Sequence, residues 1–241
     1  VAANMTAVSG RRMAETMARR GGLAIFPQDI PSDVVARSID KVKAAHPVFE
    51  TAVTVSPTTT VGETLSLIGK RAHGVAVVVD KDRRVLGLVT PQDAADSDRF
   101  AQAKDVMTSD VTRVSADTTA AQVFAVLSEQ HQKVALAVDA DQRLVGLMTP
   151  KGALRTAIYS PAVDHEGRLR AGVAVGINGD IQAKVRAALE GRADVIVMDT
   201  AHGHQEKMLS ALAIARDVRD VFEAETGRRV LIVGGNVVTT E

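Results

Sequence analysis

The sequence predicts an α/β fold in which a parallel sheet, best described as part of a barrel, is interrupted by an inserted and internally duplicated module. Three observations predict it. Short apolar strands alternate with helices at both ends of the 241-residue chain. Those strands are nearly continuous apolar runs, which is typical of strands covered on both faces or closed in a barrel. Between the two regions, the chain repeats itself without gaps at an offset of 59 residues.

Five strands are expected outside the repeat, at residues 1–5, 22–27, 171–177, 194–199 and 230–235. Polar, glycine-rich segments follow each of them, as in a TIM (β/α)8 barrel, whose active site lies at the carboxyl ends of its strands. A complete barrel needs about 200 residues or more, and fewer remain outside the repeat. Two alternatives follow: an open doubly wound sheet, or a barrel represented by about its first five strands. The abrupt ends of the sequence suggest a chain cut at both ends and favour the barrel.

Helices are expected between these strands, because apolar residues recur there at helical spacing. The first stripe comprises Met13, Ala14, Met17 and Ala18. The second stripe comprises Leu209, Leu212, Ala213 and Val218.

The repeat matches residues 55–94 to residues 114–153. Each copy contains a threonine-rich helix start, an amphipathic helix, a Val/Ala strand ending at Asp80 or Asp139, a turn and a second strand. The sequence therefore predicts two copies of one β-α-β-β module.

The ends of these modules resemble CBS motifs. The likeness lies in "GLVTPQD" (87–93) and in "DVMTSDVTRVS" (105–115), and two such motifs in tandem resemble a Bateman domain. The resemblance implies that Thr90, Asp93 and Thr149 bind a regulatory nucleotide, ATP or GTP. Gly152 replaces the second aspartate, so we expect the second position to be impaired. The alternative is that Thr90 and Thr149 only cap helices.

These patterns divide the chain into four parts. Residues 1–50 form the first barrel segment, 51–104 the first CBS motif, 105–160 the second CBS motif, and 161–241 the second barrel segment, with the barrel incomplete at the C-terminus.

The composition narrows the functional classes. Lysine plus arginine and aspartate plus glutamate both number 29, so no nucleic-acid or membrane partner is expected. The chain contains no cysteine, which excludes disulfides, thiolate metal sites and a cysteine nucleophile within these residues. No apolar run approaches the roughly 20 residues of a membrane span, and the N-terminus does not resemble a signal peptide. We therefore expect a cytoplasmic protein.

Four segments outside the repeat resemble the IMP dehydrogenase / GMP reductase family, in the family's order. They are "RRMAETMARRGGLAIFPQDI" (11–30), "GRLRAGVAVG" (167–176), "ADVIVMDTAHGH" (193–204) and "VGGNVVTTE" (233–241). The resemblance implies a purine-nucleotide oxidoreductase. The dehydrogenase oxidises IMP to XMP with NAD, and the reductase converts GMP to IMP and ammonia with NADPH. Both use a covalent step on a cysteine, which these residues alone cannot perform.

Details of the sequence favour the reductase. "AANM" (2–5) resembles the reductase branch, whereas the CBS insert and "DTAHGH" (199–204) resemble the dehydrogenase. Thr6 replaces an aspartate that both branches usually carry. The mixture resembles a CBS-containing actinobacterial branch of probable GMP reductases, with NADPH as cofactor. The alternatives are an NAD-dependent IMP dehydrogenase, which would also imply a monovalent cation, and a noncatalytic nucleotide sensor.

The resemblance also assigns roles to individual residues. Cofactor contacts are expected from Asp199, Thr200, Gly234, Gly235 and Asn236. Contacts to GMP or IMP are expected from Ala3, Asn4 and Met5. Two alternatives remain: Asp199 caps the following helix, and Met5 is a core residue.

No metal site is expected, although His202 and His204 flank a glycine close to Asp199. No third histidine is spaced to complete a ligand set. By resemblance, we expect a homotetramer that pairs into an octamer through the CBS motifs.

Overall fold

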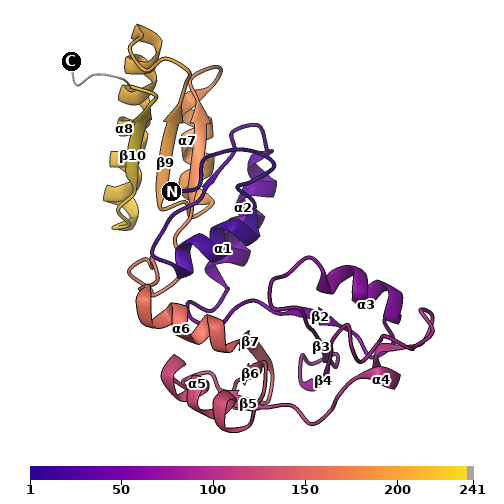
Figure 1. Ribbon diagram of the computed structural model, residues 1–241. Coiled ribbons are helices and arrows are strands. Elements are labelled where there is room, and N and C mark those ends of the chain that lie inside the picture. The colour runs from indigo at the N-terminus through magenta and orange to yellow at the C-terminus, as the bar shows by residue number, and fades with distance from the viewer. Residues whose placement is uncertain (238–241) are drawn as a thin grey trace. The chain divides into compact units, whose positions relative to one another are not determined.

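A computed structural model describes residues 1–237, which fall into two compact units (Figure 1). Unit 1 comprises residues 1–47 and the chain from Tyr159 onward, and unit 2 comprises residues 48–158. Within the described residues, no helix is long and apolar enough to span a membrane.

Unit 1 is built on a parallel sheet, which confirms the predicted α/β class. Its strands lie in the order β1 (Ile25–Phe26), β8 (Gly172–Gly176), β9 (Val195–Asp199) and β10 (Leu231–Gly235). Its helices are α1 (Arg11–Arg19), α2 (Ser32–Lys43), α7 (Ile181–Glu190) and α8 (Glu206–Thr226). The last three helices each follow one strand and lead to the next strand of unit 1.

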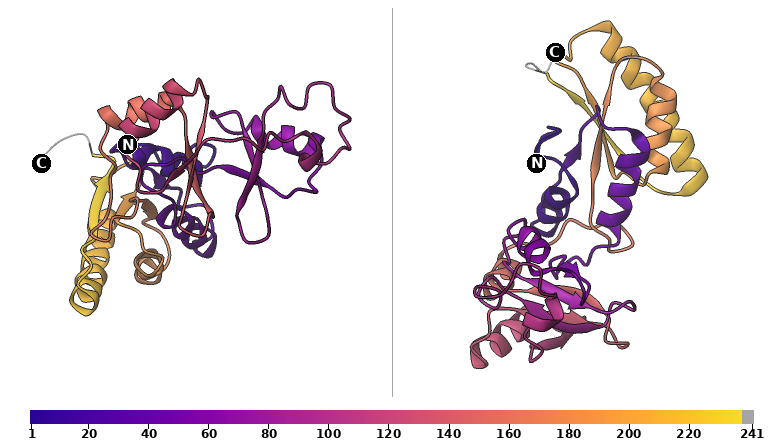
Figure 2. Two further views of the ribbon diagram at one scale, coloured as in Figure 1. Left: turned by 90° about the horizontal axis from the view of Figure 1, so that it is seen from below. Right: turned by 90° about the vertical axis from the view of Figure 1, so that its right-hand side faces the viewer.

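The core of unit 1 lies between the sheet and these helices, of which α2, α7 and α8 run along one face of the sheet (Figure 2). Val173, Val175, Ile196 and Met198 point from the strands into this core. Side chains alternate along a strand, so their neighbours face the other side of the sheet. On β10 those neighbours are Leu231 and Val233, which are 62% and 48% exposed. One face of the sheet is therefore covered by helices, and at β10 the other face is open.

The predicted strand at residues 1–5 is wrong beyond its second residue. Ala2 forms an isolated parallel bridge with Ala24, after which the chain turns, with Ser9 donating a backbone hydrogen bond to the Met5 carbonyl. The turn brings Asn4 to the carboxyl end of β9, where its side chain finds a partner. The strand predicted at 22–27 is also shorter than expected, since only Ile25–Phe26 is a regular strand.

Both predicted helical stripes coincide with helices, but only half of the second stripe is correct: Val218 is buried and Leu212 packs against the core. In α1, Ala14 and Ala18 are buried as expected. In α8, however, Leu209 and Ala213 are exposed. The buried face of α8 carries residues at alternating spacings of three and four: Met208, Ala211, Ala215, Val218 and Phe222. Met208 is the residue that fixes this phase, because it packs against Gly234 of β10.

A buried ion cluster lies at the amino ends of the strands. The Lys43 ammonium is 2.9 Å from Asp164 and 2.7 Å from Asp194, and the Lys43 side chain is only 2% exposed. Asp194 also accepts the backbone N–H of Ala171, just before β8. The cluster therefore joins the end of α2 to the segments that enter β8 and β9.

Unit 2 contains the two predicted modules. The first comprises β2 (Val53–Val55), α3 (Val61–Ile68), β3 (Ala76–Val79) and β4 (Val85–Val89), followed by the short helix α4 (Ala103–Val106). The second comprises β5 (Arg113–Ser115), α5 (Ala120–Glu129), β6 (Ala135–Val138), β7 (Leu144–Met148) and α6 (Pro150–Ile158). Each forms a three-stranded sheet in which the first pair is parallel and the second antiparallel. The β-α-β-β order predicted from the repeat is confirmed.

The repeat extends to local hydrogen bonding. Thr60 with Glu63, and Thr119 with Gln122, form capping boxes at the starts of α3 and α5. Such reciprocal bonds satisfy N–H groups that the first turn of a helix leaves free. In both modules an aspartate, Asp80 or Asp139, accepts two backbone N–H groups in the following turn. The same side-chain chemistry thus builds both copies.

The copies diverge after their last strands. The second continues into α6, whereas residues 91–97 of the first form turns without a helix. The first copy has Asp96, Ser97 and Asp98 where the second has Arg155, Thr156 and Ala157. Aspartate and serine side chains compete for backbone hydrogen bonds and disfavour helix interiors.

Candidate active site

The Asp199 carboxylate lies on the open face of the sheet, where the strands end. Gly176, Asp199 and Gly235 are paired across β8, β9 and β10 at their carboxyl ends. Because the two neighbours are glycines, Asp199 supplies the only side chain that these three positions carry. A methyl group at Gly235 would meet no atom within 4 Å. Open space therefore lies beside the carboxylate.

Two amides hold this carboxylate by the same oxygen. Asn4 Nδ2 donates to Asp199 Oδ2 at 2.8 Å, and Gln28 Nε2 donates to Oδ2 at 3.1 Å. Among residues 1–237, no hydrogen bond to Oδ1 is found. The carboxylate is therefore oriented by two neutral donors while one oxygen keeps its lone pairs for a ligand. Capping of α8 by Asp199, the alternative considered above, is not observed, since α8 begins after Gln205.

Gln28 was not among the predicted site residues. It follows β1 on the loop to α2, and its amide lies against the backbone of Gly176, where an added methyl group would overlap it. A polar side chain two residues after the first regular strand is a sequence signal that would have identified it, because carboxyl ends of neighbouring parallel strands meet at one edge. Position 176 therefore requires glycine, because the Gln28 amide occupies the space that a side chain would need.

The segments after β9 and β10 are joined by their backbones. Thr200 N–H donates to the Gly235 carbonyl, and Asn236 N–H donates to the Thr200 carbonyl, both at 2.9 Å. The Thr200 hydroxyl accepts from Gln205 Nε2 at 3.1 Å. Gly203, between the two histidines, lies so close to the Asn236 carbonyl that a side chain would not fit there. The structure therefore brings Thr200, Gly235 and Asn236 together beside Asp199.

Gly234 is placed differently from the prediction. A methyl group on it would lie 3.2 Å from Met208 and from Leu212 of α8. It therefore faces the helix and not the open face, because side-chain directions alternate along β10. Its lack of a side chain is explained by packing.

The predicted substrate residues lie on the N-terminal turn. The Ala3 carbonyl accepts a hydrogen bond from the buried Ser9 hydroxyl. Met5 is 60% exposed and so is not a core residue of unit 1. Thr6, which departs from the family's pattern, donates from Oγ1 to Asp29 Oδ2 at 2.7 Å. The turn is thus tied to Asp199 through Asn4 and to the β1–α2 loop through Thr6.

His202 and His204 are both exposed on the loop after β9. In the part of the chain that the structure describes, no three histidine, cysteine, aspartate or glutamate side chains are grouped as a metal site.

The predicted regulatory residues of unit 2 form local hydrogen bonds. Thr90 donates from both its N–H and its hydroxyl to Asp93 Oδ2 at 2.7 Å, and the Thr108 hydroxyl donates to Asp93 Oδ1 at 3.3 Å. In the second module, Thr149 Oγ1 accepts from the Gly152 N–H at 3.0 Å. The helix cap considered as an alternative is therefore present at Thr149, which precedes α6, whereas no helix follows Thr90. Both carboxylate oxygens of Asp93 already have donors.

The sheet of unit 1 is parallel, and the Asp199 side chain is held where its strands end. α/β proteins with this arrangement bind their ligands at that edge of the sheet. Residues 1–241 match the IMP dehydrogenase / GMP reductase domain, and the chain therefore belongs to that family. The family predicted from the sequence is confirmed.

Relatives on both branches of the family match nearly all of this chain. GMP reductase of Mycobacterium tuberculosis is 46% identical over 246 residues, which cover 99% of this chain and 51% of that protein. Inosine-5'-monophosphate dehydrogenase of Bacillus subtilis is 32% identical, over 100% of this chain and 49% of that protein. The chain thus spans about half the length of the curated relatives it matches.

A solved structure also matches nearly all of this chain and about half of its own. The crystal structure of GMP reductase from Trypanosoma brucei in complex with guanosine 5'-triphosphate has a TM-score of 0.66 and 26% sequence identity to this chain. The match covers 99% of this chain and 57% of that one.

Proposed function

We propose that this chain is part of an NADPH-dependent GMP reductase, which converts GMP to IMP and ammonia. The observation that carries the proposal is the higher identity to a GMP reductase, 46%, than to an IMP dehydrogenase, 32%, over the same residues. Thr6, which replaces the aspartate that both branches usually carry, is compatible with either branch, because its hydroxyl donates a hydrogen bond to Asp29 within this chain.

The order of the strands supports a barrel in the complete protein. In a doubly wound sheet the strand order reverses and helices cover both faces. Here the order follows the chain, β1-β8-β9-β10, with helices on one face. We infer that Leu231 and Val233, exposed on the other face, line the interior of a TIM barrel that further strands complete.

The residues beside Asp199 fit a nicotinamide cofactor, which would supply the hydride. Gly235 leaves room beside the carboxylate for a flat ring or a ribose, and the free Oδ1 can accept a ribose hydroxyl. Asn4 and Gln28 orient the carboxylate, while Thr200 and Asn236 offer further donors and acceptors at the same edge. The family's cysteine chemistry requires a residue beyond these 241, since none of them is cysteine.

Two spectrophotometric assays of the intact protein test the proposal. We expect loss of NADPH absorbance with GMP, and no gain of NADH absorbance with IMP and NAD. The reverse result would assign the protein to the dehydrogenase branch. Calorimetry then addresses the sensor alternative: it would be favoured by nucleotide binding to unit 2 with no binding of GMP or IMP to the barrel.

We also propose that unit 2 is a tandem CBS module that binds ATP or GTP and regulates the enzyme in a homotetramer or octamer. The proposed limits of the motifs are residues 51–104 and 105–160, between barrel segments 1–50 and 161–241. Its support is the shared β-α-β-β architecture and the position of Asp93 at the end of the first module. A ribose would replace Thr90 and Thr108 as the donor to Asp93.

Replacing Asp93 with alanine is expected to weaken ATP binding about ten-fold, because a carboxylate that accepts ribose hydroxyls contributes roughly 1.5–3 kcal/mol. Isothermal titration of the intact protein measures the change. Asp82→Ala, in an exposed turn of the same module, serves as the matched control. Equal ATP affinities for the two variants would contradict the assignment of Asp93.

Replacing Gly176 with alanine is expected to raise the KM for NADPH about three- to ten-fold, because the methyl group displaces Gln28 and removes one of the two amide hydrogen bonds to Asp199. Gln28→Ala should have a similar effect. If both act through that bond, the double variant should be no worse than either single variant. Additive losses in steady-state kinetics would show that Gly176 acts otherwise.

A further inference from the structure

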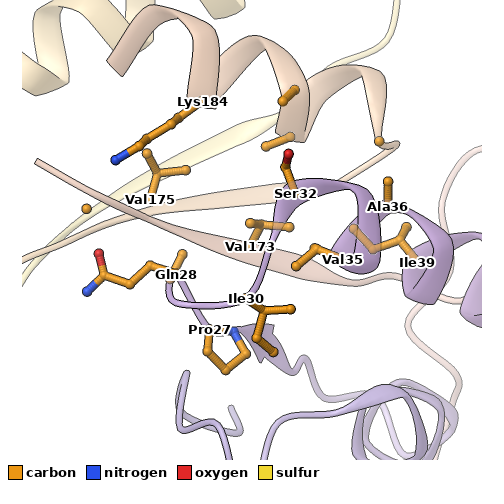
Figure 3. Close-up of a pocket in the computed structure, with 15 residues that line it drawn as sticks. Pro27, Gln28, Ile30, Ser32, Val35, Ala36, Ile39, Val173, Val175 and Lys184 are labelled. Carbon is orange, nitrogen blue, oxygen red and sulfur yellow. The ribbon is translucent and has the colours of Figure 1, made fainter. Parts of the chain in front are cut away.

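A cavity of about 200 Å³ opens beside the candidate active site, between the β1–α2 loop, α2, β8 and α7 (Figure 3). Its interior is apolar and is formed largely by buried or partly buried side chains: Ile30, Val35, Ile39, Val173 and Val175. Gln28 and Lys184, both exposed, lie at one end, and Ala36 and Ile39 lie at the other (Figure 3).

α2 and the end of α7 approach each other closely at one end of the cavity. There, a methyl group on Gly191 would lie 3.3 Å from the Ala36 side chain. The residues of α7 that line the cavity wall, Ala187 and Ala188, are too small to fill the space that opens toward Lys184.

The lining selects the chemistry of a ligand. An apolar cavity of about 150 Å³ is large enough for benzene, so this one accepts a ring or a chain of about six carbons. Lys184 is the one charged residue in the lining, which contains no carboxylate. Its ammonium donates to the Asn178 carbonyl at 2.8 Å, and an ammonium has three donors. The remaining donors suit an anion at the open end.

We propose that this cavity binds a small amphiphilic carboxylate, with its hydrocarbon body among the valines and isoleucines and its head at Lys184. The site is coupled to the candidate active site through Gln28, which lines the cavity and donates to Asp199. A carboxylate head competes for that same amide. Ligand binding therefore loosens Asp199, and by thermodynamic reciprocity a ligand that fixes Asp199 weakens binding in the cavity.

The test is calorimetry of the intact protein with hexanoate and with hexanol, in the absence of purine nucleotides and nicotinamide cofactors. We expect saturable hexanoate binding and about two- to five-fold weaker hexanol binding, since an ion pair with an exposed ammonium contributes roughly 0.2–1 kcal/mol. Lys184→Gln should reduce hexanoate to the level of hexanol, while Lys41→Gln, an exposed lysine of α2, should change nothing. Ala36→Leu, which fills the narrow end, should weaken both ligands.

Absence of saturable hexanoate binding would overturn the proposal, as would equal affinities for hexanoate and hexanol or equal effects of the two lysine variants. Coupling has its own readout. Asp199→Ala releases Gln28 and is expected to tighten hexanoate binding about five-fold, whereas unchanged affinity would overturn the coupling. Calorimetry tests ligand binding to the cavity without an enzymatic assay. Only the effect of the ligand on turnover rests on the proposed function.

Discussion

Asp199→Ala in the intact protein is expected to lower kcat/KM for NADPH about 10- to 100-fold. The physical reason is the loss of a charged acceptor: a hydrogen bond to an ionised group contributes roughly 1.5–3 kcal/mol, and each 1.4 kcal/mol is a factor of ten. The amides of Asn4 and Gln28 lose their shared partner in the same step, so the whole edge of the sheet becomes less ordered. Steady-state kinetics with varied NADPH at saturating GMP measures the effect.

Two further variants separate charge from shape. Asp199→Asn keeps the volume but removes the charge and should lose most of the same activity. Asp217→Asn, on α8, removes a carboxylate that is paired with the exposed Arg216 at 3.0 Å, and it should retain full activity. Normal kinetics for Asp199→Asn would contradict a role for the carboxylate in cofactor binding.

Lys43→Met is expected to destabilise unit 1 by about 3–5 kcal/mol, because removing one partner from a buried ion cluster leaves uncompensated charge. Here the two carboxylates of Asp164 and Asp194 would remain with their shared cation gone. Urea unfolding of the intact protein at neutral pH measures the loss. Arg37→Ala removes an ion pair whose two side chains are each 64% exposed, and should have little effect.

The same cluster predicts a dependence of stability on acid. Burial by itself would raise the pKa of Asp164, but hydrogen bonds from Lys43 and Arg168 and the charge of Lys43 outweigh it and hold the pKa well below its usual range. A lowered pKa in the folded state stabilises the fold above the unfolded value of about 3.9, and this contribution is lost as the pH falls below it. The difference between wild type and Lys43→Met should therefore shrink below about pH 4. A constant difference down to pH 3 would contradict this origin.

The elements with repeated or periodic signals were predictable from the sequence. The gapless repeat specified the order of elements in unit 2, because the same caps and turn aspartates build both copies. β8, β9 and β10 were placed within a residue or two of their observed bounds, since apolar runs ending at glycine or aspartate have clear limits. Asp199 was recognised as a candidate because it ends such a run.

What escaped prediction depends on contacts between distant segments. The strand expected at residues 1–5 is interrupted because Asn4 turns to Asp199, a partner 195 positions away. The buried face of α8 depends on Met208 packing at Gly234, which local periodicity does not reveal. Gln28 was missed although its place after β1 was a usable signal, because its partner Asp199 lies 171 positions away.

In the proposed reductase, hydride passes from NADPH to the purine at the edge of the sheet that carries Asp199. GMP carries an amino group at purine C2 and IMP carries hydrogen there, so the reductase reaction must deliver that hydrogen from the cofactor. With NADPH deuterated at C4 on both faces, the intact protein should produce IMP that is heavier by one deuterium at C2, together with ammonia. Mass spectrometry of the nucleotide gives the answer directly. Absence of labelled IMP, or formation of XMP and NADH from IMP and NAD instead, would contradict it.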